Sequence, residues 1–164
     1  MNLETSIPIV DLFEAHLRVS DLDRSIRFYG EQLGLTLAHV VPERGVAFFW
    51  IGAPGNAMLG LWKGTTDPRS ASAHVAFKVA LNDILAAPSG LRNAGIEALD
   101  FDGAVTEEPV VLAWMPAASV YFCDPDSNLL EFITMLPDPP RPDMESVPWS
   151  EWVRHAPVQN SRPY

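Results

Sequence analysis

The chain has 164 residues, the size of one ordinary domain or of two half-size units that share a core. Hydrophobic residues make up 48% of it, which is enough for a packed interior and excludes a disordered chain. The formal net charge of −10 repels phosphate backbones and anionic lipid. We therefore expect neither nucleic acid nor a membrane surface as a partner.

Cysteine content and segment hydrophobicity indicate the compartment. The single Cys123 cannot form an internal disulfide and fits a reducing environment. Residues 1–13 lack the basic flank and apolar run of a signal peptide, and no stretch approaches the roughly 20 apolar residues of a membrane helix. These features predict a cytoplasmic protein that acts on a small molecule.

The first half of the chain reads as strand, helix and three further strands. Residues 12–19 alternate in character, so that Glu14, His16 and Arg18 share one face of a half-buried strand. Ser20 opens the sequence SDLD, a helix-start signal, and apolar residues at helical spacing continue to Gly34. Runs rich in branched and aromatic residues predict strands over 35–41, 45–52 and 57–62.

The same order then restarts. After a polar linker at residues 64–72, the pattern predicts a strand over 73–80, a helix over 81–94 and strands over 96–101, 119–124 and 129–136. Residues 102–118 form either a loop or a further strand around 110–114. The repeat predicts an α+β fold with two tandem βαβββ modules, about residues 12–63 and 73–136, in one domain that spans 1–164.

Residues 137–164 differ in composition from both modules. Prolines are frequent throughout this segment, which excludes a long helix. Trp149 and Trp152 lie close together in the sequence WSEWVRH. Two large apolar rings indicate an arm that docks on a protein surface rather than a free tail.

Two side chains within apolar strands are candidates for metal binding. His74 starts a strand that is otherwise apolar on one side, and Glu131 lies inside LLEFITML, where an unpaired buried carboxylate would be costly. Ordinary alternatives are a solvent-facing glutamate and a histidine satisfied by a backbone carbonyl. Val19 and Val79 end the first strands of the two halves 60 residues apart, so Glu14, or at most its neighbour His16, is the counterpart of His74.

If the faces that carry these residues meet, three ligands converge from three strands. Imidazole nitrogen and carboxylate oxygen suit Zn²⁺, Mn²⁺, Fe²⁺, Ni²⁺ and Co²⁺ equally well. Three protein ligands with open positions are typical of a catalytic rather than a structural site. The same carboxylates and imidazoles could instead form an ion-pair network.

Three segments resemble the vicinal-oxygen-chelate superfamily: EAHLRVSDLDRSIRFYGEQLGL at 14–35, SAHVAFKV at 72–79 and VYFCDPDSNLLEF at 120–132. That superfamily contains glyoxalase I, fosfomycin-resistance enzymes, extradiol dioxygenases and metal-free bleomycin-binding proteins. The resemblance covers roughly residues 12–135. It implies a curved, barrel-like mixed sheet around a metal cleft with the helices outside, and one divalent metal ion as cofactor.

The resemblance also implies the ligands. His74 and Glu131 correspond to metal ligands, and the first-strand ligand falls on Glu14, or on His16 if the strand slips. The fourth ligand of glyoxalase I falls near Gly60, which cannot coordinate. This departure places the expected chemistry nearer to the fosfomycin enzymes and dioxygenases.

Three further residues are expected to contact substrate. Tyr121 corresponds to a tyrosine that touches substrate in relatives, with a core tyrosine as the alternative. Arg18 resembles an arginine that binds an anionic group, with an ion pair to Glu14 as the alternative. Trp114 and Met115 indicate an apolar or aromatic substrate, and the absence of a basic residue at 110–115 argues against fosfomycin itself.

The favoured interpretation is a metal-dependent enzyme that acts on a small oxygen-chelating substrate by Lewis-acid activation, as a lyase, isomerase, thiol-transferase or ring-cleaving dioxygenase. The alternative is a metal-free protein that sequesters a ligand, of the bleomycin-resistance type. The resemblance and the tryptophan arm further lead us to expect a homodimer.

Overall fold

A computed structural model describes residues 12–64 and 73–155 of the chain. The chain divides into two compact units, residues 1–71 and 72–164. Each unit contains one of the expected modules, and the strands of each module form a sheet of their own. The α+β class and the two tandem βαβββ modules are thereby confirmed.

Module 1 contains a four-stranded mixed sheet. Its elements in chain order are β1 (Glu14–Val19), α1 (Leu22–Arg27), β2 (Thr36–Val41), β3 (Val46–Ile51) and β4 (Ala57–Lys63). The strand order is β1-β4-β3-β2, with β1 parallel to β4 and the other pairs antiparallel. Leu17 and Val19 of β1 are buried on the face that packs toward α1, so Glu14, His16 and Arg18 lie on the opposite face.

The first helix of module 1 differs in detail from the expectation. Asp21, not Ser20, caps α1, because its side chain accepts a hydrogen bond from the backbone N–H of Arg24 at 3.0 Å. A π-helical turn (Phe28–Gln32) follows directly and buries two aromatic side chains, Phe28 and Tyr29. Gly34 has φ +74°, the left-handed conformation that glycine favours after a helix, as expected.

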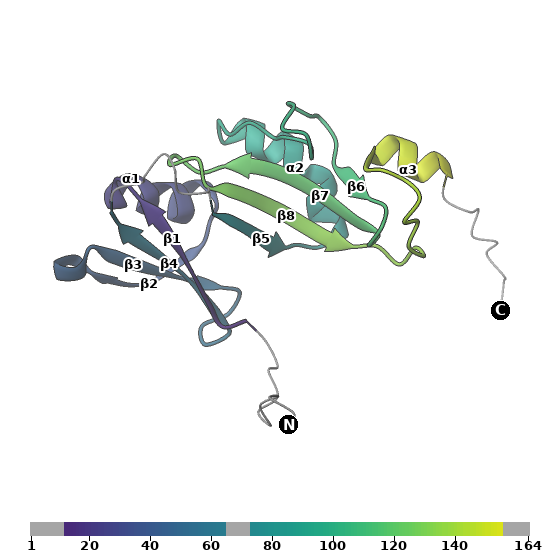
Figure 1. The fold of residues 1–164 in the computed structure, drawn as a ribbon. Coiled ribbons are helices and arrows are strands. Elements are labelled where there is room, and N and C mark those ends of the chain that lie inside the picture. Colours follow the sequence, from purple (N-terminus) through teal and green to yellow (C-terminus); the bar gives the residue numbers. More distant parts are fainter. Residues whose placement is uncertain (1–11, 65–72, 156–164) are drawn as a thin grey trace, which may run out of the picture. The chain divides into compact units, whose positions relative to one another are not determined.

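Module 2 repeats this topology. Its elements are β5 (His74–Lys78), α2 (Leu81–Asn93), β6 (Val110–Leu112), β7 (Ala117–Cys123) and β8 (Leu129–Met135). The strand order is β5-β8-β7-β6, extended at β6 by β9 (Val147–Pro148), and β5 is parallel to β8. Helix α2 packs on β7 and β8 (Figure 1). Ile84, Pro88 and Leu91 form its buried stripe, and the helix continues through Pro88.

The expected strand over 96–101 is wrong, and the alternative strand near 110–114 is present as β6. Within 96–101 only Leu99 forms β-bridges, to Val105 and Tyr121. The chain turns back immediately afterwards, because the Oδ1 atom of Asp100 accepts hydrogen bonds from the N–H groups of Asp102 and Ala104. This aspartate turn ends the pairing before a strand can form.

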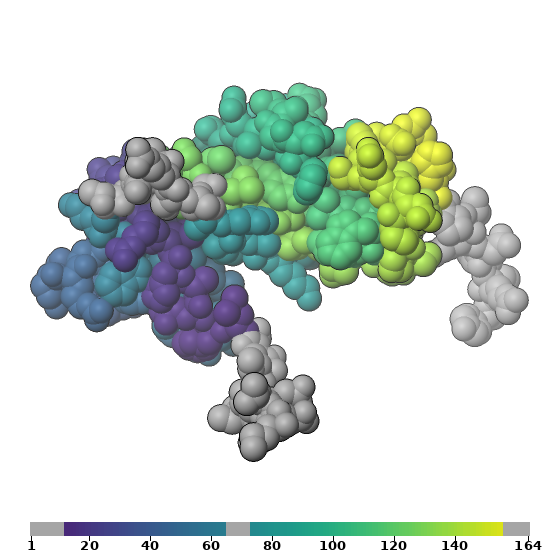
Figure 2. All heavy atoms as spheres, viewed as in Figure 1, coloured from purple at the N-terminus to yellow at the C-terminus, as the bar shows by residue number. Residues whose placement is uncertain are grey.

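The segment that follows β8 docks on its own module. β9 pairs with β6, and α3 (Trp149–His155) places Trp152 in the core with 2% of its surface exposed. The guanidinium of Arg141 lies over the Trp152 ring at 4.6 Å from the ring centre. Both carboxylate oxygens of Glu108 accept hydrogen bonds from Ser150, at 2.7 and 2.9 Å. Figure 2 shows this arm, in yellow, against the green and teal atoms of module 2.

Across the two described ranges, no helix combines the length and the apolar character needed to span a bilayer.

Candidate metal centre

His74 and Glu131 lie on the same face of the module 2 sheet. Glu131 pairs with Ala76 across the parallel strands β5 and β8, and His74 is two residues before Ala76 on the same face. The Nε2 atom of His74 is 3.0 Å from the Oε2 atom of Glu131. The glutamate is 4% exposed, whereas 48% of the histidine side chain is exposed. A buried carboxylate thus lies in contact with an imidazole that is accessible to solvent.

The second carboxylate oxygen of Glu131 is left with little compensation. Its Oε1 atom is buried and has no hydrogen bond of normal geometry. Tyr121 lies directly opposite Glu131 on β7, and Ser119 is two residues before it on the same face. A buried oxygen without a partner is costly, and a cation is one group that would satisfy it.

The hydroxyl of Tyr121 is kept in its neutral form. Burial raises the pKa of Tyr121 to about 12, and the negative charge of Glu131 adds to the rise. The ring of Tyr121 lies 6.1 Å from that of His74 and 6.2 Å from that of Phe101. Tyr121 is therefore a proton donor at the edge of the His74–Glu131 pair.

These residues fit a divalent metal in donor type. Imidazole nitrogen and carboxylate oxygen serve Zn²⁺, Mn²⁺, Fe²⁺, Ni²⁺ and Co²⁺. The partnerless Oε1 atom of Glu131 and the accessible ring of His74 are the observations that support the fit. Within residues 12–64 and 73–155, no three His, Cys, Asp or Glu side chains are close enough together to hold a metal ion. Module 2 alone thus brings together two side chains of suitable donor type, His74 and Glu131.

Module 1 carries the matching positions. Both modules pair their first strand in parallel with their fourth, His16 opposite Gly60 and Ala76 opposite Glu131. Glu14, two residues before His16, therefore corresponds to His74, and Gly60 corresponds to Glu131. The Oε2 atom of Glu14 is 3.6 Å from the Nε2 atom of His16. The structure thus places both first-strand candidates together on one face.

Arg18 and Trp114, the other two residues expected to contact substrate, lie in different modules. Arg18 is exposed on the same strand face as Glu14 and His16, opposite the face that packs on α1. Trp114 lies in the turn between β6 and β7 and is 61% exposed. Tyr121 is four residues beyond the start of β7 at Ala117, about 13 Å along the strand. Trp114 and Tyr121 thus lie at different positions along the strand direction of the module 2 sheet.

Sequence analysis missed several residues around the site. Ser119 shares the face of Tyr121, and its position was predictable from the alternation along β7. Phe101 reaches the Tyr121 ring from the turn that replaces the expected strand, so periodicity gave no signal for it. Trp62 contacts His16 across two strands, and only the register of β1 against β4 reveals that contact.

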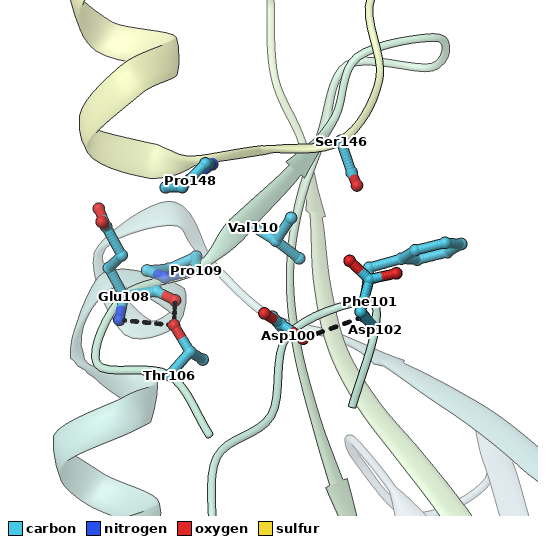
Figure 3. A pocket seen from close by; sticks show the side chains of 9 residues that line it. All are labelled: Asp100, Phe101, Asp102, Thr106, Glu108, Pro109, Val110, Ser146 and Pro148. Atoms are coloured by element: carbon cyan, nitrogen blue, oxygen red, sulfur yellow. Dashed lines mark hydrogen bonds between the residues drawn. The ribbon is translucent and has the colours of Figure 1, made fainter. Parts of the chain in front are cut away.

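Module 2 also contains a cavity of about 180 Å³ beside Phe101 (Figure 3). It is lined by Asp100, Phe101, Asp102, Thr106, Glu108, Pro109, Val110, Ser146 and Pro148. The carboxylates of Asp100 and Glu108 already accept hydrogen bonds from backbone and serine groups. Two of the three acidic side chains that line the cavity therefore already stabilise other parts of module 2, Asp100 the turn after Leu99 and Glu108 the segment that contains Ser150.

Comparison with known families agrees with this geometry. The model of the glyoxalase/bleomycin resistance protein/dioxygenase superfamily matches residues 10–132. The match spans well over half of the chain, and the protein belongs to this superfamily. No curated protein matches the sequence.

Several solved structures share the fold. An integron cassette protein from the mobile metagenome of the Halifax Harbour sewage outfall is 28% identical, with a TM-score of 0.65 over 77% of this chain and 100% of that one. A glyoxalase/bleomycin resistance protein/dioxygenase from Nocardioides is 26% identical, with a TM-score of 0.62 over 84% and 90%. Lactoylglutathione lyase from Agrobacterium tumefaciens is 21% identical, with a TM-score of 0.58 over 77% and 95%, a likeness of fold alone.

The raised pKa of Tyr121 predicts a distinct ionisation. In protein treated with a chelator, the ultraviolet difference between wild type and Tyr121→Phe should develop near pH 12 rather than near pH 10. Because the folded pKa exceeds the unfolded one, the stability that the neutral phenol contributes is complete below about pH 10 and lost as pH rises toward 12. A difference spectrum centred at pH 10 would contradict the buried contact with Glu131.

Proposed function

We propose that the protein is a divalent-metal-dependent enzyme of this superfamily, which acts on a small substrate with two neighbouring oxygens. The observation that supports this most is the buried carboxylate of Glu131, whose Oε2 atom faces Nε2 of His74 at 3.0 Å while Oε1 has no partner. His74 and Glu131 would be ligands, and Glu14 or His16 would supply the first-strand ligand. A metal bound there would act as a Lewis acid on substrate oxygens.

The residues of module 2 would set the proton chemistry. Tyr121 holds its proton at neutral pH, since burial and the charge of Glu131 raise its pKa to about 12. It can therefore donate a hydrogen bond to an oxygen that gains negative charge, and it is a weak base. Exposure of His74 leaves an approach for a small molecule from one side.

Metal binding tests the proposal directly. His74→Ala and Glu131→Gln should each lower the affinity for Co²⁺ by more than the roughly 10–100-fold that changes next to a ligand cause. Isothermal titration measures this, with His39→Ala and Glu107→Gln as controls on an exposed strand and an exposed loop. Unchanged affinity in both site variants would favour the alternative function, a metal-free protein that sequesters a ligand of the bleomycin-resistance type.

The substrate contacts form a second part of the proposal. We expect Arg18 to bind a negative charge of the substrate and Trp114 its apolar part, because a guanidinium suits carboxylates and 61% of the tryptophan is exposed. Oxalate and phenylpyruvate both present neighbouring oxygens to a metal, and only the second carries a ring. They therefore separate the two contacts.

In Co²⁺-loaded protein, Arg18→Ala should weaken oxalate binding about 10-fold or more, the loss expected of a charge-assisted hydrogen bond. Trp114→Ala should weaken phenylpyruvate and leave oxalate unchanged. Lys63→Ala is the matched control, because this cation ends β4 next to the same strand. Equal losses in Arg18→Ala and Lys63→Ala, measured by competition titration, would remove Arg18 from the site.

We also propose a homodimer. The Trp149/Trp152 arm packs on its own module, with Trp152 buried and β9 paired to β6, and would brace an interface rather than cross it. Sedimentation of the full chain at micromolar concentration should give the mass of two chains. A single-chain mass across that range would contradict the dimer.

A further inference from the structure

The strand position beside β7 in module 2 is shared by two separate segments of the chain. Leu99 bridges to Tyr121, and β6 pairs further along the same strand, with Val110 opposite Ser119. The intervening residues 100–109 leave the sheet, starting at the turn that the Asp100 side chain stabilises. The cavity of about 180 Å³ lies at this interruption and is lined by residues of module 2 throughout.

The walls of the cavity are held in place by hydrogen bonds within the protein. The backbone N–H of Thr106 donates to the carbonyl oxygen of Ala98 at 2.9 Å, and its hydroxyl donates to the carbonyl oxygen of Glu108 at 2.7 Å. On the side of the arm, the N–H of Trp149 donates to the carbonyl oxygen of Pro109 at 2.8 Å. The cavity is therefore formed before any ligand arrives, which lowers the entropic cost of binding.

Part of the cavity surface is apolar. Pro109, Val110 and Pro148 contribute aliphatic groups to the lining. Phe101 contributes an aromatic ring that also contacts Tyr121, with ring centres 6.2 Å apart, and 58% of this phenylalanine is exposed. A cavity of roughly 150 Å³ is large enough to admit benzene. One six-membered ring therefore fits the space beside Phe101.

One carboxylate oxygen at the cavity remains available to a ligand. The Oδ1 atom of Asp100 accepts hydrogen bonds from the N–H groups of Asp102 and Ala104, at 3.0 and 2.8 Å. Across residues 12–64 and 73–155, no group is hydrogen-bonded to its Oδ2 atom. In Figure 3 the hydroxyl of Ser146 points from the arm toward the side of the cavity formed by Asp100 and Phe101.

The charge around the cavity selects the sign of its ligand. Asp100, Asp102 and Glu108 all line it, and no Lys, Arg or His is among the lining residues. The net charge of −10 for the whole chain further raises the local concentration of cations. An anion would be repelled, whereas an N–H donor that carries positive charge would form a strong hydrogen bond with a free carboxylate oxygen.

We propose that this cavity binds a small organic cation, in which an ammonium group is attached to a single six-membered ring. The ammonium group donates to Oδ2 of Asp100, and the ring packs against Phe101 and Pro148. Attraction between the positive charge and the face of the Phe101 ring adds to the binding. The site lies within module 2 alone, apart from His74 and Glu131, and does not depend on the proposed metal-dependent function.

Nuclear magnetic resonance titration of the full chain with benzylammonium chloride tests the proposal, in the presence of a chelator. The backbone amide signals of Asp102 and Ala104 should shift saturably. Benzyl alcohol, which has the same ring and no charge, should bind at least about 10-fold more weakly, the difference expected of a charge-assisted hydrogen bond. Equal affinity for the two compounds, or shifts that do not saturate, would overturn the proposal.

Three variants separate the contribution of charge from that of space. Asp100→Asn keeps a side-chain oxygen for the turn but removes the charge, so it should lower benzylammonium affinity about 10-fold or more and leave benzyl alcohol binding unchanged. Asp143→Asn, the matched control, removes the same charge from an exposed position of the arm that does not line the cavity, and should change neither.

Ser146→Leu fills the cavity from the arm without altering the turn at Asp100, and should abolish binding of both compounds. This variant tests the site even if Asp100→Asn disturbs the turn. Benzylammonium binding that survives Ser146→Leu, or that falls equally in Asp100→Asn and Asp143→Asn, would overturn the assignment of this cavity.

Discussion

Parallel pairing of the first strand with the fourth strand in each module is the constraint on which the candidate site depends. In module 2 this pairing sets Glu131 opposite Ala76 and brings it to the face that carries His74. A slip by one residue would turn Glu131 toward α2, where the core is apolar, and leave His74 without its partner. The helix between the first two strands makes such a parallel return possible, since parallel neighbours need a long crossover.

The burial of Glu131 is an energetic cost of the same arrangement. An ionised carboxylate that is 4% exposed needs compensation, and His74, Tyr121 and Ser119 offer only part of it. A group of this kind is seldom retained for stability alone, because an apolar side chain of similar volume would serve a core as well. Its presence beside an accessible imidazole therefore points to function, and the superfamily to which the chain belongs agrees with that direction.

Much of the fold was predictable because its signals are local. Alternation and helical spacing located β1, β5, β7, β8 and both main helices, and the repeat indicated the topology. The strand expected over 96–101 failed because the Asp100 side chain accepts hydrogen bonds from the N–H groups of Asp102 and Ala104 and turns the chain back. The pair His74–Glu131 was foreseeable from parity and resemblance. The contact of Trp62 with His16 was not, because it depends on cross-strand register and on the absence of a side chain at Gly60.

The short pairing of β9 with β6 also affects whether strands of other chains can add to the edge of the module 2 sheet. An open sheet edge presents free N–H and C=O groups, which can recruit strands from other chains into aggregates. Here β6 is covered by only two residues, and the new edge ends in Pro148, which has no N–H to offer. The adjoining Trp149 N–H is already bonded to the carbonyl oxygen of Pro109 at 2.8 Å. The arm thus closes this side of the sheet to further strand addition with very few residues.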